Sequence, residues 1–153
     1  MSVYENLKKL NVDIPKAPDP VGAYVAYKKT ANLLFISGQI SIDDNGNITK
    51  GKLGKELSID QGQAAAKLCA INIIAQAKKA CDERLETIRN CIKLTGYVNS
   101  TNEFNDQPKV INGASEIISA VFGENGKHTR AAISANSLPL NAAVEVDAIF
   151  ELK

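Results

Sequence analysis

Apolar residues recur at helical spacing in two long segments of this chain. From residue 58 to about residue 81 the sequence is rich in alanine, and its apolar residues fall on two adjoining faces. From residue 108 to residue 122 one apolar stripe follows the i, i+3, i+4, i+7 spacing. The pattern predicts two amphipathic helices, and the doubled stripe of the first indicates burial on more than one side.

The ends of both predicted helices carry recognisable signals. Ser58 precedes Gln61 by three residues, the spacing of a capping box in which each side chain satisfies a free backbone N–H. Pro108 is tolerated in the first turn of the second helix, and Gly123 is a plausible stop at its end. These residues bound the helices at 58–81 and 108–122.

Alternating apolar and polar residues predict strands elsewhere in the chain. Residues 24–27 and 33–37 favour two strands joined by a polar tip, and residues 88–98 favour a third because they are rich in β-branched and aromatic residues. From Arg130 onward the pattern predicts two strands with a turn at Pro139 that reverses the chain, so the two strands could pair as a hairpin. In the last strand Val144, Val146, Ala148 and Phe150 share one face, and Glu145, Asp147 and Glu151 the other.

The order of these elements predicts an α+β sandwich. Two helices would cover one face of a mostly antiparallel sheet. The other face must also be covered if it is apolar, and a trimer that curls three sheets around one axis would cover it.

Composition limits the class of protein. The chain has 153 residues, of which 44% are hydrophobic, and this suits a single domain over 1–153 with residues 1–20 as a lead-in. The formal net charge is +1 and the basic residues are scattered, which argues against nucleic acid as a partner. Three cysteines without a CxxC pair and an N-terminus without an apolar signal favour a cytoplasmic protein with no membrane partner.

Arg130 and Glu145 are the first candidates for chemistry. If their strands pair as a hairpin, the guanidinium and the carboxylate could line one pocket. Such a pocket suits a small carboxylate substrate that awaits attack by water. A surface or interface ion pair is the alternative for Arg130, and a salt bridge between subunits is the alternative for Glu145.

Several separate motifs resemble the YjgF/Rid family, the reactive intermediate deaminases. They are Val21-Gly22-Ala23-Tyr24, the run from Asn32 to Ile40, Asn102-Glu103-Phe104, and an ungapped signature from Arg130 through Leu138-Pro139 to Glu145. The extended loop 51–57 and the run Ser137-Leu138-Pro139-Leu140-Asn141 resemble a subgroup of this family whose chains are longer. The resemblance covers nearly the whole chain.

This resemblance implies a chorismate-mutase-like fold and a homotrimer with active clefts between neighbouring subunits. It also implies hydrolysis of 2-imino acids, which arise from enamines released by pyridoxal-phosphate enzymes, to 2-keto acids and ammonia. Neither a metal ion nor an organic cofactor is required for this chemistry.

The same resemblance implies roles for individual residues. Arg130 would bind the substrate carboxylate, helped by the backbone N–H of Ala132. Glu145 would orient or deprotonate the attacking water, and Tyr24 would close one wall of the cleft. Positions that line or shape the family's cleft match Ser37, Gly38 and Asn112.

Each role has a structural alternative. Tyr24 could equally be a half-buried aromatic residue that packs near the start of a strand. Ser37 and Gly38 could form a strand end that needs small side chains. Asn112 could be a solvated or capping residue of the second helix. His128 lies in a polar loop without a nucleophile beside it, so a loop histidine is expected. The pair Asp43-Asp44 lies in an Asn-Gly turn, where solvated residues are the rule.

Some positions depart from the family pattern. Gly22-Ala23-Tyr24 replaces Gly-Pro-Tyr, His128-Thr129-Arg130 replaces Pro-Ala-Arg, and Ala132 stands where many members have cysteine. Two other functions stay open. One is a small-carboxylate or keto-acid binding protein without turnover, and the other is an endoribonuclease or translation inhibitor, which the near-neutral charge disfavours.

Overall fold

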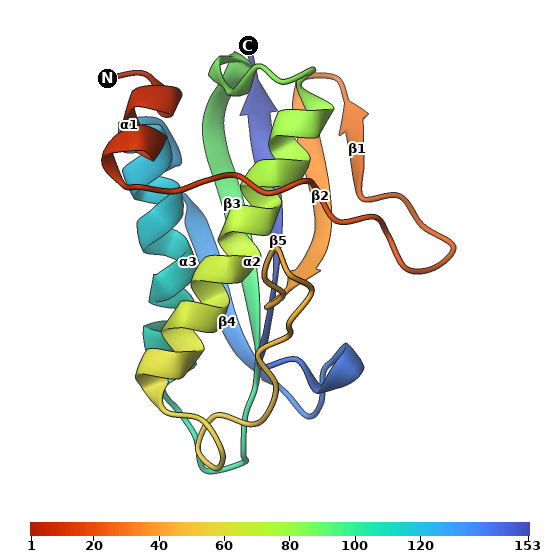
Figure 1. Ribbon diagram of the computed structural model, residues 1–153, viewed down its shortest axis with the longest axis vertical. Helices are drawn as coiled ribbons and strands as arrows, with labels where there is room; N and C mark the ends of the chain where they lie inside the picture. The colour runs from red at the N-terminus through yellow and green to blue at the C-terminus, as the bar shows by residue number, and fades with distance from the viewer.

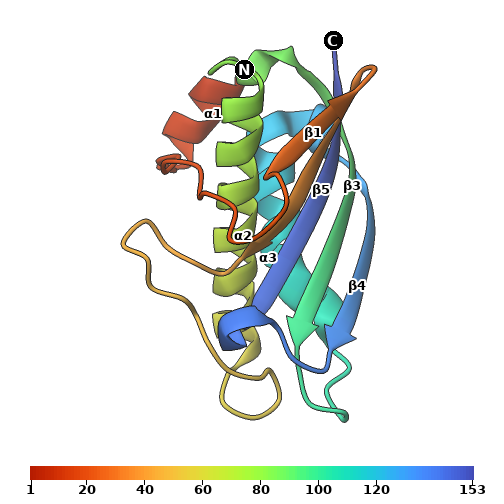
Figure 2. The ribbon, with the colours of Figure 1, turned by 90° about the vertical axis from the view of Figure 1, so that its right-hand side faces the viewer.

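A five-stranded sheet with helices on one face forms the molecule, in a computed structural model that describes all residues from Met1 to Lys153 (Figure 1). Turned by 90°, the molecule shows the helices on one side of the sheet and the other side bare (Figure 2). The predicted α+β sandwich is therefore confirmed. The elements are α1 (Val3–Lys9), β1 (Tyr27–Thr30), β2 (Leu33–Ile40), α2 (Ile59–Ala80), β3 (Ile88–Asn99), α3 (Gln107–Phe122), β4 (Thr129–Ala135) and β5 (Val144–Leu152).

The sheet has the strand order β1-β2-β5-β3-β4. Only β3 and β4 are parallel, and α3 connects them as a crossover helix. The other neighbours are antiparallel, so the prediction of a mostly antiparallel sheet is confirmed.

The predicted hairpin between the last two strands is wrong. Strand β5 pairs with β2 on one side and with β3 on the other, and β4 is left at the edge beyond β3. A central position suits β5 because its inward side chains are fully buried and both of its backbone edges find partners. The segment around Pro139 instead crosses the end of β3, which brings β5 to its position between β2 and β3.

The predicted helix boundaries agree closely with the structure. At the start of α2 the Ser58 N–H donates to Gln61 Oε1 at 2.9 Å, and the Gln61 N–H donates to Ser58 Oγ at 3.2 Å, so the capping box is confirmed. Helix α3 ends where Gly123 adopts a positive φ of 61°.

The first strand begins and ends later than predicted, and the second begins at the predicted residue but ends later. Strand β1 covers Tyr27–Thr30 rather than 24–27, so Tyr24 precedes it, and β2 continues to Ile40. The polar tip is shorter than expected because Ala31 takes a left-handed conformation and lets Thr30 pair directly with Leu33. Lysines are acceptable in β1 because it is an edge strand.

The core lies between the sheet and the two long helices. The inward residues of β5, from Val144 to Phe150, are at most 1% exposed. Helices α2 and α3 approach closely at Gly113, where a Cβ atom would collide with the backbone of Gln63. None of the helices combines the length and the apolar character that crossing a membrane requires.

The face of the sheet away from the helices carries exposed apolar side chains. Phe35 on β2 is 41% exposed and Ile133 on β4 is 48% exposed. Each alternates with inward-facing neighbours, so both project from the bare face.

Candidate functional site

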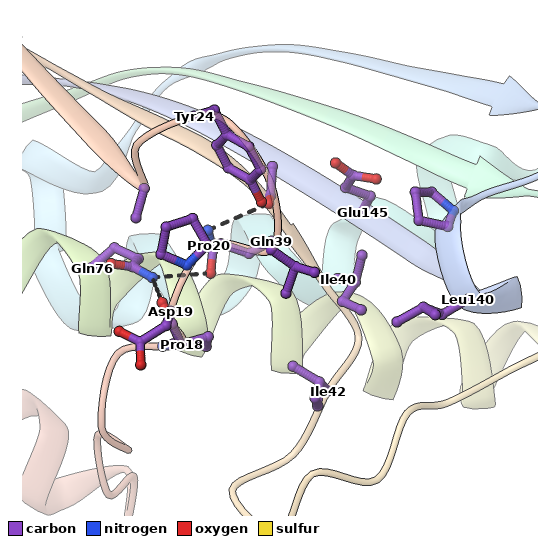
Figure 3. Close-up of a pocket in the computed structure, with 14 residues that line it drawn as sticks. Pro18, Asp19, Pro20, Tyr24, Gln39, Ile40, Ile42, Gln76, Leu140 and Glu145 are labelled. Carbon is purple, nitrogen blue, oxygen red and sulfur yellow. Dashed lines mark hydrogen bonds between the residues drawn. The ribbon is translucent and has the colours of Figure 1, made fainter.

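Three of the residues predicted for the site line one cavity of about 570 Å³: Tyr24, Gly38 and Glu145. The cavity lies where β2 extends past Tyr27, the first residue of β1, and the segment 18–26 borders it there (Figure 3). The turn before β5 contributes Pro139 and Leu140, and Leu140 holds a left-handed φ of 59°. Non-glycine residues in this conformation are often found at functional sites.

Glu145 is a half-buried acid with no partner in its own chain. Its carboxylate makes no hydrogen bond and no ion pair within the chain. Burial raises the pKa of Glu145, and the like charge of Asp147 raises it further. A free carboxylate with a raised pKa is suited to accept a proton from water.

Gly38 makes room for this carboxylate. It lies in a register shift of β2 between Ile36 and Gln39, and a Cβ atom there would overlap the Glu145 carboxyl group. The Ser37 hydroxyl donates to the Val25 carbonyl at 2.7 Å and fastens the segment 18–26 to β2. Both residues thus shape the cavity, and a Cβ atom at position 38 would displace the Glu145 carboxyl group.

Tyr24 stands at the mouth of the cavity. Its side chain is 51% exposed and its hydroxyl has no hydrogen-bond partner within the chain. The ring lies 3.4 Å from where a Cβ atom would project at Gly22, whose φ is 143°. Tyr24 is therefore free to donate a hydrogen bond to a ligand or to water.

Arg130 is held beside α3 by neutral acceptors. Its Nη1 donates to Asn112 Oδ1 at 2.8 Å and to Ser115 Oγ at 3.1 Å, and its Nη2 donates to the Pro108 carbonyl at 3.3 Å. No acid pairs with it. A guanidinium has five N–H donors, so two stay free and the positive charge is not neutralised. This arrangement orients the cation and leaves it able to bind an anion.

Asn112 contacts Arg130, which is a role that the sequence did not reveal. Ser115 lies one turn further along α3 and also binds the guanidinium, and the same Ser115 Oγ lies 2.9 Å from Nε2 of His128. The other ring nitrogen of His128 contacts the Gly126 carbonyl at 2.6 Å. Ser115 was missed, although its i+3 spacing from Asn112 places both on one helix face.

One chain does not bring Arg130 and Glu145 together. Arg130 pairs with Leu94, which is buried against the helices, whereas Glu145 pairs with Tyr97 on the other face. Paired residues project from the same face of a sheet, so the two charged side chains point to opposite faces. The expected single pocket within one hairpin is wrong. Ala132 shares the face and the edge strand of Arg130.

The cysteines are unsuited to nucleophilic chemistry. Cys69, Cys81 and Cys91 are all buried and unpaired. Burial raises the pKa of Cys91 to about 12, and burial together with the Glu145 charge raises the pKa of Cys69 well above its usual value. Reactive cysteines require the opposite shift.

The sheet with its helices and the cavity beside Glu145 define an α+β protein with room for a small molecule. The family model described as "YjgF/chorismate_mutase-like, putative endoribonuclease" matches residues 5–152. The chain therefore belongs to the YjgF family, as the sequence motifs indicated.

Individual relatives agree with this assignment. Protein TCP17 from Trypanosoma cruzi is 41% identical over 98% of this chain and 94% of its own length. The crystal structure of protein Atu1372 from Agrobacterium tumefaciens, whose function is unknown, has a TM-score of 0.92 at 43% identity, over 99% of this chain and 92% of that one. RidA from a Psychrobacter species has a TM-score of 0.63 at 25% identity, over 90% and 94% of the two chains.

Proposed function

We propose that this protein hydrolyses 2-imino acids to 2-keto acids and ammonia, in a site that Arg130 of one subunit and Glu145 of its neighbour form together. The observation that carries this proposal is the pair of incomplete half-sites. One holds an oriented cation without an anion, and the other holds a half-buried carboxylate without a partner. Membership of the family that contains RidA supports the reaction.

A homotrimer would join the two half-sites. The bare face of the sheet exposes Phe35 and Ile133, and β4 presents a free strand edge beside Arg130. A head-to-tail ring of three subunits buries this face and places each β4 edge against the next subunit's cavity. A closed trimer then has three equivalent clefts.

The reaction needs binding of the substrate, orientation of a water molecule and two proton transfers through one carboxylate. The free N–H groups of Arg130 bind the substrate carboxylate, and the backbone N–H of Ala132 adds a donor. Glu145 takes a proton from water as the water oxygen attacks the carbon of the protonated imine, and it passes this proton to the nitrogen. Glu145 then takes the proton of the new hydroxyl as the carbon–nitrogen bond breaks, and it gives this proton to the departing ammonia. A keto acid and ammonium leave. Positioning of water and imine lowers the barrier by several kcal/mol.

An ammonia-release assay tests this function. The imine 2-iminopropanoate is generated in place by an amino-acid oxidase, and wild type is compared with Arg130→Ala. We expect wild type to release ammonia well above the spontaneous rate and the variant to lose most of this increase. A wild-type rate equal to the spontaneous rate would refute the enzyme and favour a keto-acid binding protein, which calorimetry with pyruvate would then detect.

The endoribonuclease reading makes a different prediction. The chain has a net charge of +1, and so small a positive charge gives little attraction to the phosphate backbone of RNA. Cleavage of RNA that persists in Arg130→Ala would show an activity independent of the proposed site.

A further inference from the structure

One side of the cavity beside Glu145 is apolar. Ile40 pairs directly with Glu145 across β2 and β5, so both side chains project from the same face of the sheet. Ile42 and Leu140 lie on the same side of the cavity as Ile40, away from Asp19 (Figure 3). Ile40, Ile42 and Leu140 together form an apolar wall next to the proposed base.

Leu140 occupies an unfavourable conformation in this wall. It projects from the turn before β5, its φ is 59°, and it remains 65% exposed. The left-handed conformation strains a residue with a bulky apolar side chain, whereas glycine adopts it readily. Burial within its own chain does not offset the strain, because most of the residue is exposed. A leucine in this position therefore points to a ligand that it contacts.

Polar contacts fix the turn before β5. The Asn99 side chain donates through Nδ2 to Asn141 Oδ1 and to the Ala142 carbonyl, both at 3.2 Å, and Asn99 is only 1% exposed. Lys52 Nζ donates to Asn99 Oδ1 at 2.8 Å and also to the Asn136 carbonyl. These contacts orient the Asn99 amide and tie the turn to the end of β3. The apolar wall thus has a defined position beside the cavity.

The cavity has room for a side chain much larger than a methyl group. Its volume of about 570 Å³ lies within the range of cavities that hold drug-sized ligands. Glu145 and Asp19 are the only acids in its lining, and no lysine or arginine lines it. Asp19 lies at the other side, with its Oδ1 3.9 Å from Lys79 Nζ. A polar side chain at the apolar wall would lose water without gaining a partner, whereas an apolar one would bury surface.

We infer that the apolar wall receives the side chain of the substrate, and that the preferred substrates are 2-imino acids with branched or aromatic apolar side chains, such as the imine derived from leucine. Leu140 is thus a residue that determines specificity. The alanine-derived 2-iminopropanoate is still hydrolysed, but its methyl group contacts little of the wall and its kcat/KM is lower. This inference rests on the proposed function, because it places the imino carbon beside Glu145.

Two imines that differ by three carbons test the inference. An amino-acid oxidase generates the leucine-derived and the alanine-derived imine in the assay. We expect wild type to prefer the leucine-derived imine about tenfold in kcat/KM, since each buried carbon of the substrate contributes to binding. Leu140→Ala should reduce this preference to about threefold or less, and Leu140→Met, which conserves the volume, should restore most of it.

A matched control separates specificity from stability. Leu10→Ala removes another exposed leucine, outside the cavity, and should keep the wild-type preference. A loss of folded protein lowers kcat/KM for both imines by the same factor, so the ratio of the two values reports on the wall alone.

Binding of the keto acids separates this inference from the proposed function. Calorimetry compares 4-methyl-2-oxopentanoate with pyruvate on wild type and Leu140→Ala. If neither imine is hydrolysed above the spontaneous rate, the proposed enzyme fails, but a tenfold preference in Kd that Leu140→Ala loses would still support the apolar wall. In that case, equal Kd values would overturn the inference too. If wild type hydrolyses both imines with equal kcat/KM, or Leu140→Ala keeps the wild-type preference, the enzyme stands and the inference is overturned.

Discussion

At the residue scale, the carboxyl group of Glu145 controls the expected pH dependence. Burial first, and the Asp147 charge second, raise the pKa of Glu145 above its usual value. Activity requires the ionised form, so the rate should fall as pH drops through this raised pKa. Asp147→Asn removes the like charge and should move the acid limb of the kcat/KM profile to lower pH. An unmoved limb would show that Asp147 does not act on the base.

The same carboxylate makes a prediction about stability. Its folded-state pKa is raised, so its protonated form contributes stability below the unfolded pKa, and this contribution is lost as pH rises through the folded pKa. In dissociated subunits, where no neighbour's arginine faces this carboxylate, Glu145→Gln should therefore unfold at higher urea concentration than the parent chain at neutral pH, and the difference should vanish below the unfolded pKa. A variant less stable than wild type at neutral pH would show that the ionised carboxylate is stabilised by a partner.

Arg130 should not tolerate a change to lysine. Its two free N–H groups and its planar charge hold the substrate carboxylate, and an ammonium group cannot reproduce this fork. We expect Arg130→Lys to lower kcat/KM about a hundredfold, the loss of one to two charge-assisted hydrogen bonds. Retention of more than half of the wild-type value would rule out a bidentate anchor.

Individual site residues could be predicted from the sequence where they belong to a family motif. Arg130 and Glu145 stand in a signature that the sequence displays, and the structure shows both without an acid or a cation that neutralises them. Ser115 was not found in this way, because a serine within an apolar helix gives no sign that it binds an arginine. That contact depends on how α3 packs beside β4, which is a long-range property of the fold.

At the element scale, substitution of two glycines by alanine should have different effects, one mainly on stability and the other mainly on activity. A Cβ atom at Gly113 would collide with the backbone of Gln63, where α3 and α2 cross, and overpacking of this kind costs about 1–3 kcal/mol. A Cβ atom at Gly38 would instead displace the Glu145 carboxyl group. We expect Gly113→Ala to lower Tm, and Gly38→Ala to lower kcat about tenfold or more with a smaller change in Tm.

The pair serves as its own control, since both variants add one methyl group. Thermal unfolding and the imine assay are measured on both proteins at one subunit concentration. If Gly38→Ala keeps wild-type kcat, the Glu145 carboxylate does not need its observed position.

Helices were more predictable than strand pairing. The capping box at Ser58 and the stripe of α3 are local signals, and both helices lie within a residue or two of their predicted bounds. Strand order is a long-range property: nothing between residues 130 and 152 tells that β3 separates β4 from β5. The hairpin prediction failed for this reason, and with it the expectation that Arg130 and Glu145 share one pocket.

At the scale of the whole molecule, the bare face of the sheet is expected to be an interface. Phe35 and Ile133 lie there, exposed to solvent in one chain. Light scattering on the purified protein should give three times the mass of 16.4 kDa. Ile133→Lys should lower this mass and abolish activity together, because the subunits supply different parts of the site. An active monomer would exclude a shared cleft.

Mixing of two inactive variants tests the central claim most directly. Arg130→Ala subunits keep Glu145, and Glu145→Gln subunits keep Arg130, so a cleft between the two kinds can be complete. After joint refolding of equal amounts, random assembly of rings should restore about a quarter of the wild-type imine hydrolysis. Activity that stays at the level of the separate variants would show that both residues act within one chain, or not at all, and would contradict this account.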